Sequence, residues 1–340
     1  MTRNNPTVIF TEPQVAILEN RTVSKPTSGQ LLIKSQSTLI STGTELTIFS
    51  GDFPEESVWA RLAQFPCPSG YSNVGEVVDV GADISQDWLG KRVASKGNHA
   101  GYVTVEAQTV VPIPDGVPTA QATFSTLAGT VMNSVRRADV GWGDVVVIYG
   151  AGILGQLAAR FCRLAGAHRV VSVDLVDSRL ARLPDDKAFI PINPTQTDVV
   201  TTVDAVTKGR LADIVFEATG NPKLIPDELQ SLRRHGRFIL MSSPRGKTEF
   251  DFHDLCNSPS FTIIGTHGSS NPPYDTPDTP WTRSRNNEFF FDLILDDALD
   301  LAPMVSHQEA YTEAPRLFDM LLTDRSQAMG VVLDWSHVEA

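Results

Sequence analysis

The sequence predicts a two-domain α/β protein in which a small antiparallel β-barrel precedes a doubly wound parallel sheet. Up to about residue 122, short apolar runs alternate with turns that contain Gly and Pro, which is typical of antiparallel strands. From residue 123 the pattern changes to strands that alternate with helical segments. A β-branched run at 145–149 then leads directly into the glycines of 150–155, as a strand does when it turns into a helix.

The individual elements follow this change of pattern along the chain. In the first region we expect a short helix at 46–50, turns at 26–29 and 114–116, and strands at 30–35, 75–80, 92–95 and 102–105. In the second region we expect five parallel strands, at 145–149, 169–173, 214–218, 238–241 and 261–265. A proline-rich loop at 269–280, a helix at 314–322 and a strand at 330–334 complete the prediction.

The composition is that of an ordinary soluble globular protein of 340 residues, with 41% hydrophobic and 20% charged residues. A formal net charge of −12 argues against a nucleic-acid partner, because a phosphate backbone would be repelled. Residues 1–11 do not resemble a signal peptide, and no apolar run approaches the roughly 20 residues that span a bilayer. Three scattered cysteines fit reduced thiols, so we expect a cytoplasmic protein with no membrane partner.

Residues 145–155 carry a dinucleotide-binding pattern. Gly150, Gly152 and Gly155 form a G-x-G-x-x-G directly after a strand, with Ile153 and Leu154 between the last two glycines. The first glycine allows the tight turn, the second lets a phosphate approach the backbone, and the third lets helix and strand pack closely. The backbone N–H groups and the dipole of the helix start suit a pyrophosphate. These residues therefore predict a nicotinamide dinucleotide site.

The acidic residue at the end of the next strand indicates which dinucleotide is bound. Asp174 lies 24 residues after Gly150, close to where this fold places the carboxylate that binds the adenosine ribose hydroxyls. Such a carboxylate would repel the 2′-phosphate of NADP, so NAD is favoured. Arg179 could pair with a phosphate or cover the adenosine.

Two further segments carry a resemblance to a known family. Residues 43–51 (G-T-E-L-T-I-F-S-G) resemble the C-G-T-D-x-H-x-x-x-G segment of the medium-chain dehydrogenase/reductase superfamily, with Thr42 in place of the cysteine. Residues 70–81 resemble its G-H-E-x-x-G-x-V-x-x-V-G segment. The resemblance implies a GroES-like catalytic domain at 1–122, a Rossmann NAD-binding domain at 123–268, and a return to the catalytic domain at 269–340. It also implies a homodimer or homotetramer.

The family's zinc ligands are replaced in this sequence. The positions that hold catalytic zinc in relatives correspond to Thr42, Tyr71 and Thr126, whose hydroxyl and phenol groups are poor zinc ligands. The four-cysteine lobe that holds structural zinc is also missing. We therefore expect no metal, although His99 and Glu45 could form a different site. Residues 41–45, 70–75 and 98–100 resemble a zinc-lacking branch that includes bacteriochlorophyllide-type dehydrogenases and bi-domain oxidoreductases.

Without zinc, hydrogen-bond donors must stabilise the oxygen that becomes negative during hydride transfer. By its position, Tyr71 is the first candidate, and the alternative is a packing aromatic. His99 could titrate near neutral pH or be an ordinary loop histidine. Glu45 could orient His99 or cap a helix, and Lys96 could hold a charged substrate or be a solvated surface charge.

The remaining cofactor contacts are implied only by the resemblance. They comprise a residue of the replaced metal site, a residue near the nicotinamide face, and residues at the ends of the later strands of the parallel sheet. These residues are Thr42, Thr130, Thr219, Met241, Ser242, Ser243, Thr266 and Gly268.

The function that these features favour is a zinc-independent, NAD-dependent oxidoreductase acting on a secondary alcohol or ketone. Its small-molecule substrate would be a polyol, a sugar-like compound or a specialised metabolite. One alternative is a reductase of enones or quinones that uses NAD(P)H. Another is a dinucleotide-binding sensor without turnover, which the loss of every zinc ligand would permit.

Overall fold

The computed structural model describes residues 4–272 and 274–338. Pro273 of the proline-rich loop and the outermost residues of the first and last predicted domains lie outside this range. The chain forms two compact units: unit 1 comprises Met1–Leu127 and Ser284–Ala340, and unit 2 comprises Ala128–Arg283. The two limits fall within helices α4 (Ser125–Arg137) and α9 (Arg283–Leu295). The domain limits proposed from the sequence stay predictions.

Unit 1 is built mainly from β-strands, as the sequence predicts. Its helices are α1 (Thr44–Ser50), α2 (Val58–Leu62), α3 (Thr119–Ala122) and α10 (Ala314–Thr323). Its strands are β1 (Pro6–Glu12), β2 (Val15–Asn20), β3 (Gln30–Ile40), β4 (Cys67–Pro68), β5 (Asn73–Val80), β6 (Arg92–Ser95), β7 (Tyr102–Glu106), β8 (Val111–Pro112), β15 (Val305–Ala310) and β16 (Gly330–Asp334).

Among the described residues, the strands of unit 1 form two sheets. The larger has the order β15-β16-β3-β5-β6-β8, with β7 paired to β3, and the smaller has the order β2-β1-β4. All pairs are antiparallel except β15 with β16. Strand β3 runs five residues beyond its predicted end because β5 and β16 pair with its polar second half. This extension places Thr38 inside the sheet, which matters for the site below.

An aromatic cluster fills the core of unit 1. The ring of Phe10 packs edge-on against Phe318, with centroids 4.9 Å apart, and lies 5.1 Å from Phe49. Trp335, which follows β16, is fully buried in the same cluster and stacks on Tyr311. These rings join α1, α10 and the first strand into one hydrophobic core.

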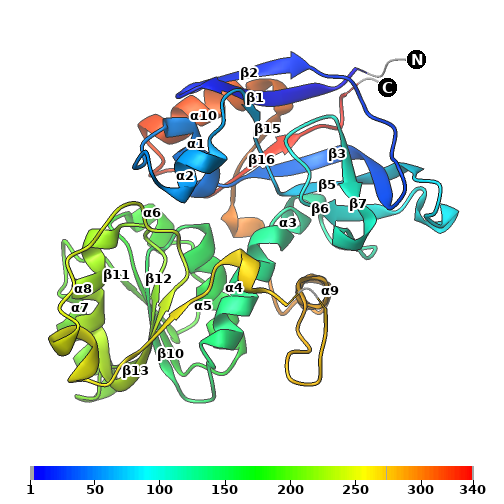
Figure 1. Ribbon diagram of the computed structural model, residues 1–340. Coiled ribbons are helices and arrows are strands. Elements are labelled where there is room, and N and C mark those ends of the chain that lie inside the picture. Colours follow the sequence, from blue (N-terminus) through cyan, green and yellow to red (C-terminus); the bar gives the residue numbers. More distant parts are fainter. Residues whose placement is uncertain (1–3, 273, 339–340) are drawn as a thin grey trace. The chain divides into compact units, whose positions relative to one another are not determined.

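Unit 2 contains the doubly wound parallel sheet that the sequence predicts (Figure 1). Its helices are α5 (Ile153–Leu164), α6 (Asp177–Leu180), α7 (Val199–Thr207) and α8 (Ile225–Glu228). Its strands are β9 (Val145–Tyr149), β10 (Arg169–Val173), β11 (Phe189–Ile192), β12 (Ala212–Glu217), β13 (Leu232–Leu240) and β14 (Thr262–Gly265). The strand order is β11-β10-β9-β12-β13-β14, the order of a dinucleotide-binding fold.

Helices cover both faces of this sheet (Figure 1). Val203 of α7 and Ile225 of α8 pack on one face, together with Val147, Val171 and Val215 of the strands. Helix α5 packs against β9 and β10. All five residues of β9 are therefore buried, which explains why its sequence is an unbroken apolar run.

One strand of this sheet escaped prediction. Strand β11 is a four-residue edge strand, Phe-Ile-Pro-Ile, and pairs in parallel with β10. Pro191 lowers its strand signal, because proline cannot donate to a neighbouring strand. An edge position tolerates this loss, since only one side of the strand is paired.

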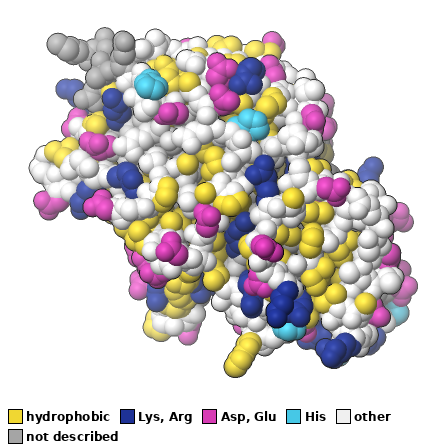
Figure 2. Space-filling view, turned by 180° about the vertical axis from the view of Figure 1, so that it is seen from behind, with side chains coloured by type: hydrophobic (Ala, Val, Ile, Leu, Met, Phe, Trp, Pro, Cys, Tyr) yellow, Lys and Arg dark blue, Asp and Glu magenta, His cyan; other side chains and the backbone are white. Residues whose placement is uncertain are grey.

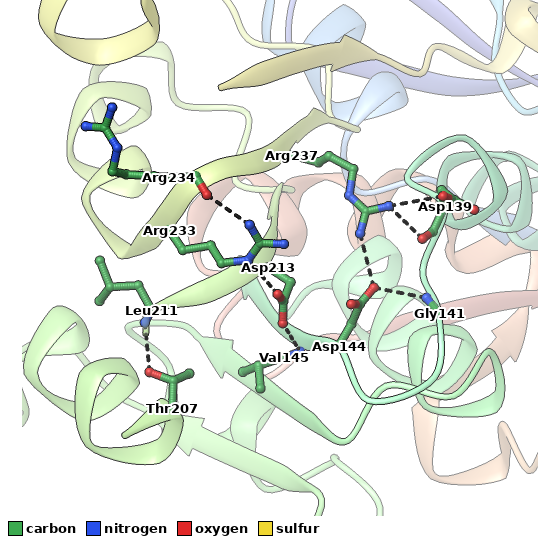
Figure 3. Close-up of polar contacts among 10 residues, drawn as sticks. All are labelled: Asp139, Gly141, Asp144, Val145, Thr207, Leu211, Asp213, Arg233, Arg234 and Arg237. Atoms are coloured by element: carbon green, nitrogen blue, oxygen red, sulfur yellow. Dashed lines mark hydrogen bonds and ion pairs between the residues drawn. The ribbon is translucent and has the colours of Figure 1, made fainter. Parts of the chain in front are cut away.

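Ion pairs join the starts of three strands in unit 2 (Figure 3). The Asp213 carboxylate accepts hydrogen bonds from the Val145 N–H at 2.8 Å and from Arg233 Nε at 2.6 Å. Arg237 donates to Asp144 at 3.2 Å. These bonds lie at the opposite ends of the strands from the glycine-rich turn, so they stabilise the sheet and leave the predicted cofactor edge open.

The surface carries charges of both signs. Figure 2 shows Lys and Arg side chains interspersed with Asp and Glu on one face of the molecule. No helix within 4–272 or 274–338 has the length and apolar character that a membrane crossing requires.

Candidate active site

The glycine-rich turn between β9 and α5 has a backbone that only glycine allows at two of its positions. Gly150 has a φ of +95°, and a Cβ there would lie 2.8 Å from the Ala218 carbonyl oxygen. A Cβ on Gly155 would lie 1.8 Å from the Gly150 carbonyl oxygen. Gly152 differs, because a Cβ there would meet nothing within 4 Å. The packing of strand on helix thus requires Gly150 and Gly155, whereas the space beside Gly152 is open to a ligand.

The start of α5 supplies backbone donors next to this open position. Gly152 is the N-cap in an extended conformation, and no side chain caps the helix. The first N–H groups of a helix have no partner within it, so those of Ile153 and Leu154 suit an anion. The side chain of Ile153 is buried in the core. The backbone of this turn therefore has the donors and the open space that the motif predicts, and its role in phosphate binding stays a prediction.

Asp174, which follows β10, lies beside the same turn. Its Oδ2 accepts a hydrogen bond from the Ala151 N–H at 2.8 Å, and its Oδ1 accepts one from the Val176 N–H at 2.9 Å. Arg179 Nη1 lies 3.7 Å from Oδ2. Each carboxylate oxygen keeps a further acceptor position, so Asp174 can still bind ribose hydroxyls. The adjacent guanidinium offsets part of its negative charge.

Three of the other predicted cofactor residues gather around the ends of β12 and β13. Thr219 donates both its N–H and its hydroxyl to Glu217 Oε1, each at 2.7 Å. The N–H groups of Met241 and Ser242 donate to the Glu217 carbonyl oxygen at 3.1 Å. Ser243, one residue further on, is exposed.

Three further cofactor candidates lie together near the end of β14. Thr266 is fully buried; its hydroxyl accepts from Ser134 Oγ at 2.8 Å and donates to the Leu240 carbonyl at 3.2 Å. A Cβ on Gly268 would lie 3.2 Å from Thr130 Oγ1. Thr130 and Gly268 are thus neighbours, whereas the buried Thr266 hydroxyl is engaged within the protein.

In unit 1, three of the four predicted catalytic residues form one buried polar cluster. The Tyr71 hydroxyl donates to Ser41 Oγ at 2.5 Å, and the Ser41 N–H donates to Glu45 Oε1 at 2.9 Å. His99 Nε2 lies 2.8 Å from Glu45 Oε2. Glu45 and His99 are 2% and 0% exposed, whereas Tyr71 is half-buried. Of these three residues, Tyr71 is therefore the one that keeps some exposed surface.

The hydrogen bonds behind His99 indicate its tautomer. The Trp335 indole can only donate, and it donates to Thr38 Oγ1 at 2.9 Å. Thr38 Oγ1 also lies 2.7 Å from His99 Nδ1. All these groups are satisfied when Thr38 donates to Nδ1 and the neutral imidazole donates its Nε2–H to Glu45. Both ring nitrogens are then engaged, and His99 holds the Glu45 carboxylate in place.

The environment of Tyr71 keeps its phenol protonated. Burial and the neighbouring Glu45 charge raise the pKa of Tyr71 to about 12, although hydrogen bonds with Ser41 and Thr44 act in the opposite direction. At neutral pH the side chain is therefore a hydrogen-bond donor.

The remaining predicted residues of unit 1 lie apart from this cluster or take no visible part in it. Lys96 is exposed and lines a cavity of about 270 Å³ together with Arg21 and Asn98. Thr42 is half-buried, and its carbonyl oxygen accepts a hydrogen bond from Arg325 at 3.4 Å.

The donor atoms at the family's metal positions do not fit zinc. Thr42, Tyr71 and Thr126 offer only hydroxyl and phenol oxygens, and the Tyr71 oxygen is bonded to Ser41. Glu45 and His99 are hydrogen-bonded to each other. Within the described part of the chain, no three His, Cys, Asp or Glu side chains form a group that could hold a metal ion.

Sequence reasoning missed four residues that build these sites: Thr38, Ser41, Trp335 and Glu217. The first three make contacts that the sequence pattern does not indicate, because their partners lie 30 to 297 residues away. Glu217 had a signal that was overlooked, since a carboxylate directly after the buried apolar run 214–216 must find hydrogen-bond donors.

Comparison with known proteins places these sites in context. A sequence model of the zinc-binding dehydrogenase family matches residues 154–281, which lie outside the positions of the zinc ligands. L-threonine 3-dehydrogenase of Pyrococcus abyssi is 28% identical over 327 residues, covering 86% of this chain and 88% of its own.

Solved structures share the fold over nearly the whole chain. 2R,3R-butanediol dehydrogenase of Bacillus subtilis superposes with a TM-score of 0.81 at 19% identity, covering 97% of this chain and 99% of its own. An Escherichia coli alcohol dehydrogenase in complex with NADH gives a TM-score of 0.80 at 16% identity, with the same coverage.

Proposed function

Because this chain belongs to the medium-chain dehydrogenase/reductase superfamily, we propose that it is a zinc-independent, NAD(H)-dependent oxidoreductase that interconverts a secondary alcohol and a ketone. Membership of the superfamily makes the chain an oxidoreductase related to dehydrogenases. One observation carries the finer proposal. Tyr71 stands at a position of a metal ligand in relatives and is joined to the buried Ser41, Glu45 and His99 cluster.

The residues of unit 2 fit a nicotinamide dinucleotide. The backbone at Gly152, Ile153 and Leu154 would hold the pyrophosphate, and Asp174 would accept hydrogen bonds from the adenosine ribose. The carboxylate favours NAD over NADP, although the adjacent Arg179 weakens this preference. When bound, the dinucleotide supplies or accepts the hydride.

In this proposal Tyr71 takes over the task of stabilising the substrate oxygen. A phenol whose pKa is raised to about 12 stays protonated at neutral pH. Its one O–H, which donates to Ser41 Oγ in the free protein, must turn to the carbonyl oxygen of the substrate to donate there during reduction. Glu45 keeps the proton on the phenol by its charge, and His99 holds Glu45. After each turnover the Tyr71 proton is replaced from solvent, with which the half-buried residue keeps contact.

The substrate class follows from the chemistry of the relatives. L-threonine and 2R,3R-butanediol, after which two similar proteins are named, both carry a secondary hydroxyl. We propose the same bond as the target here, in a polyol, a sugar-like compound or a specialised metabolite. The exposed Lys96 is not assigned a role in catalysis.

The proposal is tested on the purified protein with ketones and secondary alcohols, in the presence of NAD(H) or NADP(H), alongside metal analysis. We expect turnover with NAD(H) and no stoichiometric zinc. Tyr71→Phe should lower kcat by about 100-fold, the size of a general acid's contribution, and leave NADH affinity unchanged. Tyr311→Phe, which changes another half-buried tyrosine of unit 1, serves as the control.

The pH dependence gives a second readout. Because the pKa of Tyr71 is raised to about 12, ketone reduction should stay constant up to about pH 10, whereas alcohol oxidation should accelerate as the phenol loses its proton more readily. Turnover of Tyr71→Phe within twofold of the original protein would refute the role of the phenol. Tightly held zinc in equal amount would refute zinc independence.

A further inference from the structure

Glu217 is a buried carboxylate at the cofactor edge of unit 2 that the proposed mechanism does not use. It is the last residue of β12, is 0% exposed, and pairs with Tyr149 at the end of β9. Strands β9 and β12 are neighbours whose chain connections run in opposite directions across the sheet. Ligands of such sheets bind at the carboxyl ends of the strands at this point.

The carboxylate joins two turns that are separate in sequence. Its Oε1 accepts from the Thr219 N–H and hydroxyl, each at 2.7 Å, and from the Gly220 N–H at 2.8 Å. Its Oε2 accepts from the Ser242 hydroxyl, which belongs to the turn after β13. Four donors thus converge on one side chain, and this number satisfies a buried carboxylate without a cation.

The first of these turns packs directly against the glycine-rich turn. The Ala218 N–H donates to the Tyr149 carbonyl at 2.8 Å, and the Ala218 carbonyl oxygen limits the space at Gly150. The Thr219 hydroxyl donates to Glu217 and accepts from the Asn221 N–H at 3.0 Å. Its proton is therefore committed to the carboxylate, so any contact of Thr219 with a ligand depends on how Glu217 holds the turn.

A second buried carboxylate nearby provides a contrast. Glu228 is 1% exposed, and neither of its carboxyl oxygens has a hydrogen-bond partner. Burial, together with the charges of Glu217 and Asp227, raises the pKa of Glu228 to about 9, so it is neutral at pH 7. Glu217 is thus the carboxylate of this pair that holds neighbouring turns by hydrogen bonds. Glu228, which makes none with its carboxyl group, is a matched control of the same residue type.

We propose that Glu217 is a positioning residue of the dinucleotide site, which fixes the turns at 218–221 and 241–245 before the cofactor binds and does not touch the cofactor itself. The inference rests on the proposed NAD(H) dependence. It assigns to one carboxylate the alignment of two turns: the one that borders the phosphate-binding glycines and the one that follows β13. Loss of this alignment costs binding affinity, because the free protein then samples turn conformations that cannot hold the dinucleotide.

The test is NADH titration by fluorescence, carried out well below the melting temperature of each variant. Glu217→Gln keeps the size and one acceptor oxygen but loses the charge, and should raise the Kd for NADH about 10-fold. Ser242→Ala removes the side-chain bond between the two turns, keeps the backbone bond from Arg245 to Gly220, and should raise the Kd about 3-fold. Glu228→Gln should leave it within twofold. In steady state, Glu217→Gln should raise KM for NAD more than it lowers kcat.

The outcomes separate this inference from the proposed function. If the original protein binds no NADH, the dinucleotide proposal fails and this one fails with it. The original protein could bind NADH while the variants Glu217→Gln and Ser242→Ala bind it equally tightly. That result would refute only the role of Glu217. A shift in melting temperature without a change in Kd would also refute it, because that is the result of a purely structural role. If Glu217→Gln does not fold, the Kd of Ser242→Ala for NADH decides whether the proposal holds.

Discussion

The two units each bury one carboxylate in a network of hydrogen bonds, but the networks are built over different distances in the sequence. Glu217 takes its bonds from residues two, three and 25 positions away. Glu45 binds His99, which is 54 positions away, and His99 contacts Thr38, which is 61 positions away. Trp335, which donates to Thr38, comes from the end of the chain.

This difference separates the two halves of the proposed chemistry. The proposed dinucleotide site consists of short turns whose geometry depends on glycines and on local hydrogen bonds. The site for the reacting oxygen depends on a buried network that exists only when β3, α1 and the C-terminal residues are all in place. Damage to the first should abolish cofactor binding, whereas damage to the second should reduce stability and turnover and leave cofactor binding intact.

The largest effect is expected at the glycine-rich turn. In Gly155→Ala, the new Cβ would lie 1.8 Å from the Gly150 carbonyl oxygen, so the turn must open. We expect a loss of at least 100-fold in NADH affinity and about 3 kcal/mol of destabilisation, as measured by titration and by urea unfolding. Gly152→Ala is the control for packing, because its Cβ meets nothing. It should weaken NADH binding without a change in stability, and equal destabilisation by both variants would contradict this account.

An intermediate effect is expected in the long-range network of unit 1. His99→Ala removes a hydrogen-bond donor from the buried Glu45 carboxylate and should cost about 2 kcal/mol, the contribution of a hydrogen bond to a charged group. NADH affinity should not change. Lys96→Ala, an exposed position three residues earlier, should change the free energy of unfolding by less than about 0.5 kcal/mol. A stable His99→Ala protein would show that the network contributes little.

The smallest effect on NADH affinity is expected from Glu228→Gln, whose effect on stability depends on pH. The folded protein keeps a proton on Glu228 up to about pH 9, whereas the unfolded chain releases it near pH 4.5. Stability therefore falls as pH rises between these values. Replacing the carboxyl group should remove this dependence, which amounts to about 1.4 kcal/mol for each pH unit between the two pKa values, so the variant should gain stability of several kcal/mol at pH 8 and none at pH 4. Urea unfolding at the two pH values tests this, and equal gains at both would contradict the assignment.

Much of the local structure of the candidate cofactor site could be predicted from the sequence because its signals are local. The run of 145–155 specifies strand, turn and helix within a few residues, and the structure forms that turn with the conformation at Gly150 that only glycine favours. Edge strand β11 was not predicted because Pro191 interrupts its short apolar run. The role of Glu217 was not predicted because its hydrogen-bond donors lie in turns whose conformation the sequence does not specify.

The catalytic candidates were only partly predictable. Tyr71, Glu45 and His99 were identified by their positions in motifs, and the structure brings these three together while Lys96 lies in a separate cavity. No pattern indicated that His99 would be fully buried with both nitrogens engaged. Burial of a polar residue depends on which strands pair, and a motif does not record that.

By itself the sequence determined the α/β fold class and the glycine turn, because hydrophobic periodicity and backbone conformation act over a few residues. Only the tertiary structure decided that Tyr71 is the accessible member of its cluster, that His99 serves Glu45, and that Glu217 joins two turns. Those outcomes depend on hydrogen bonds between side chains far apart in the chain, whose partners become neighbours only after the strands have paired.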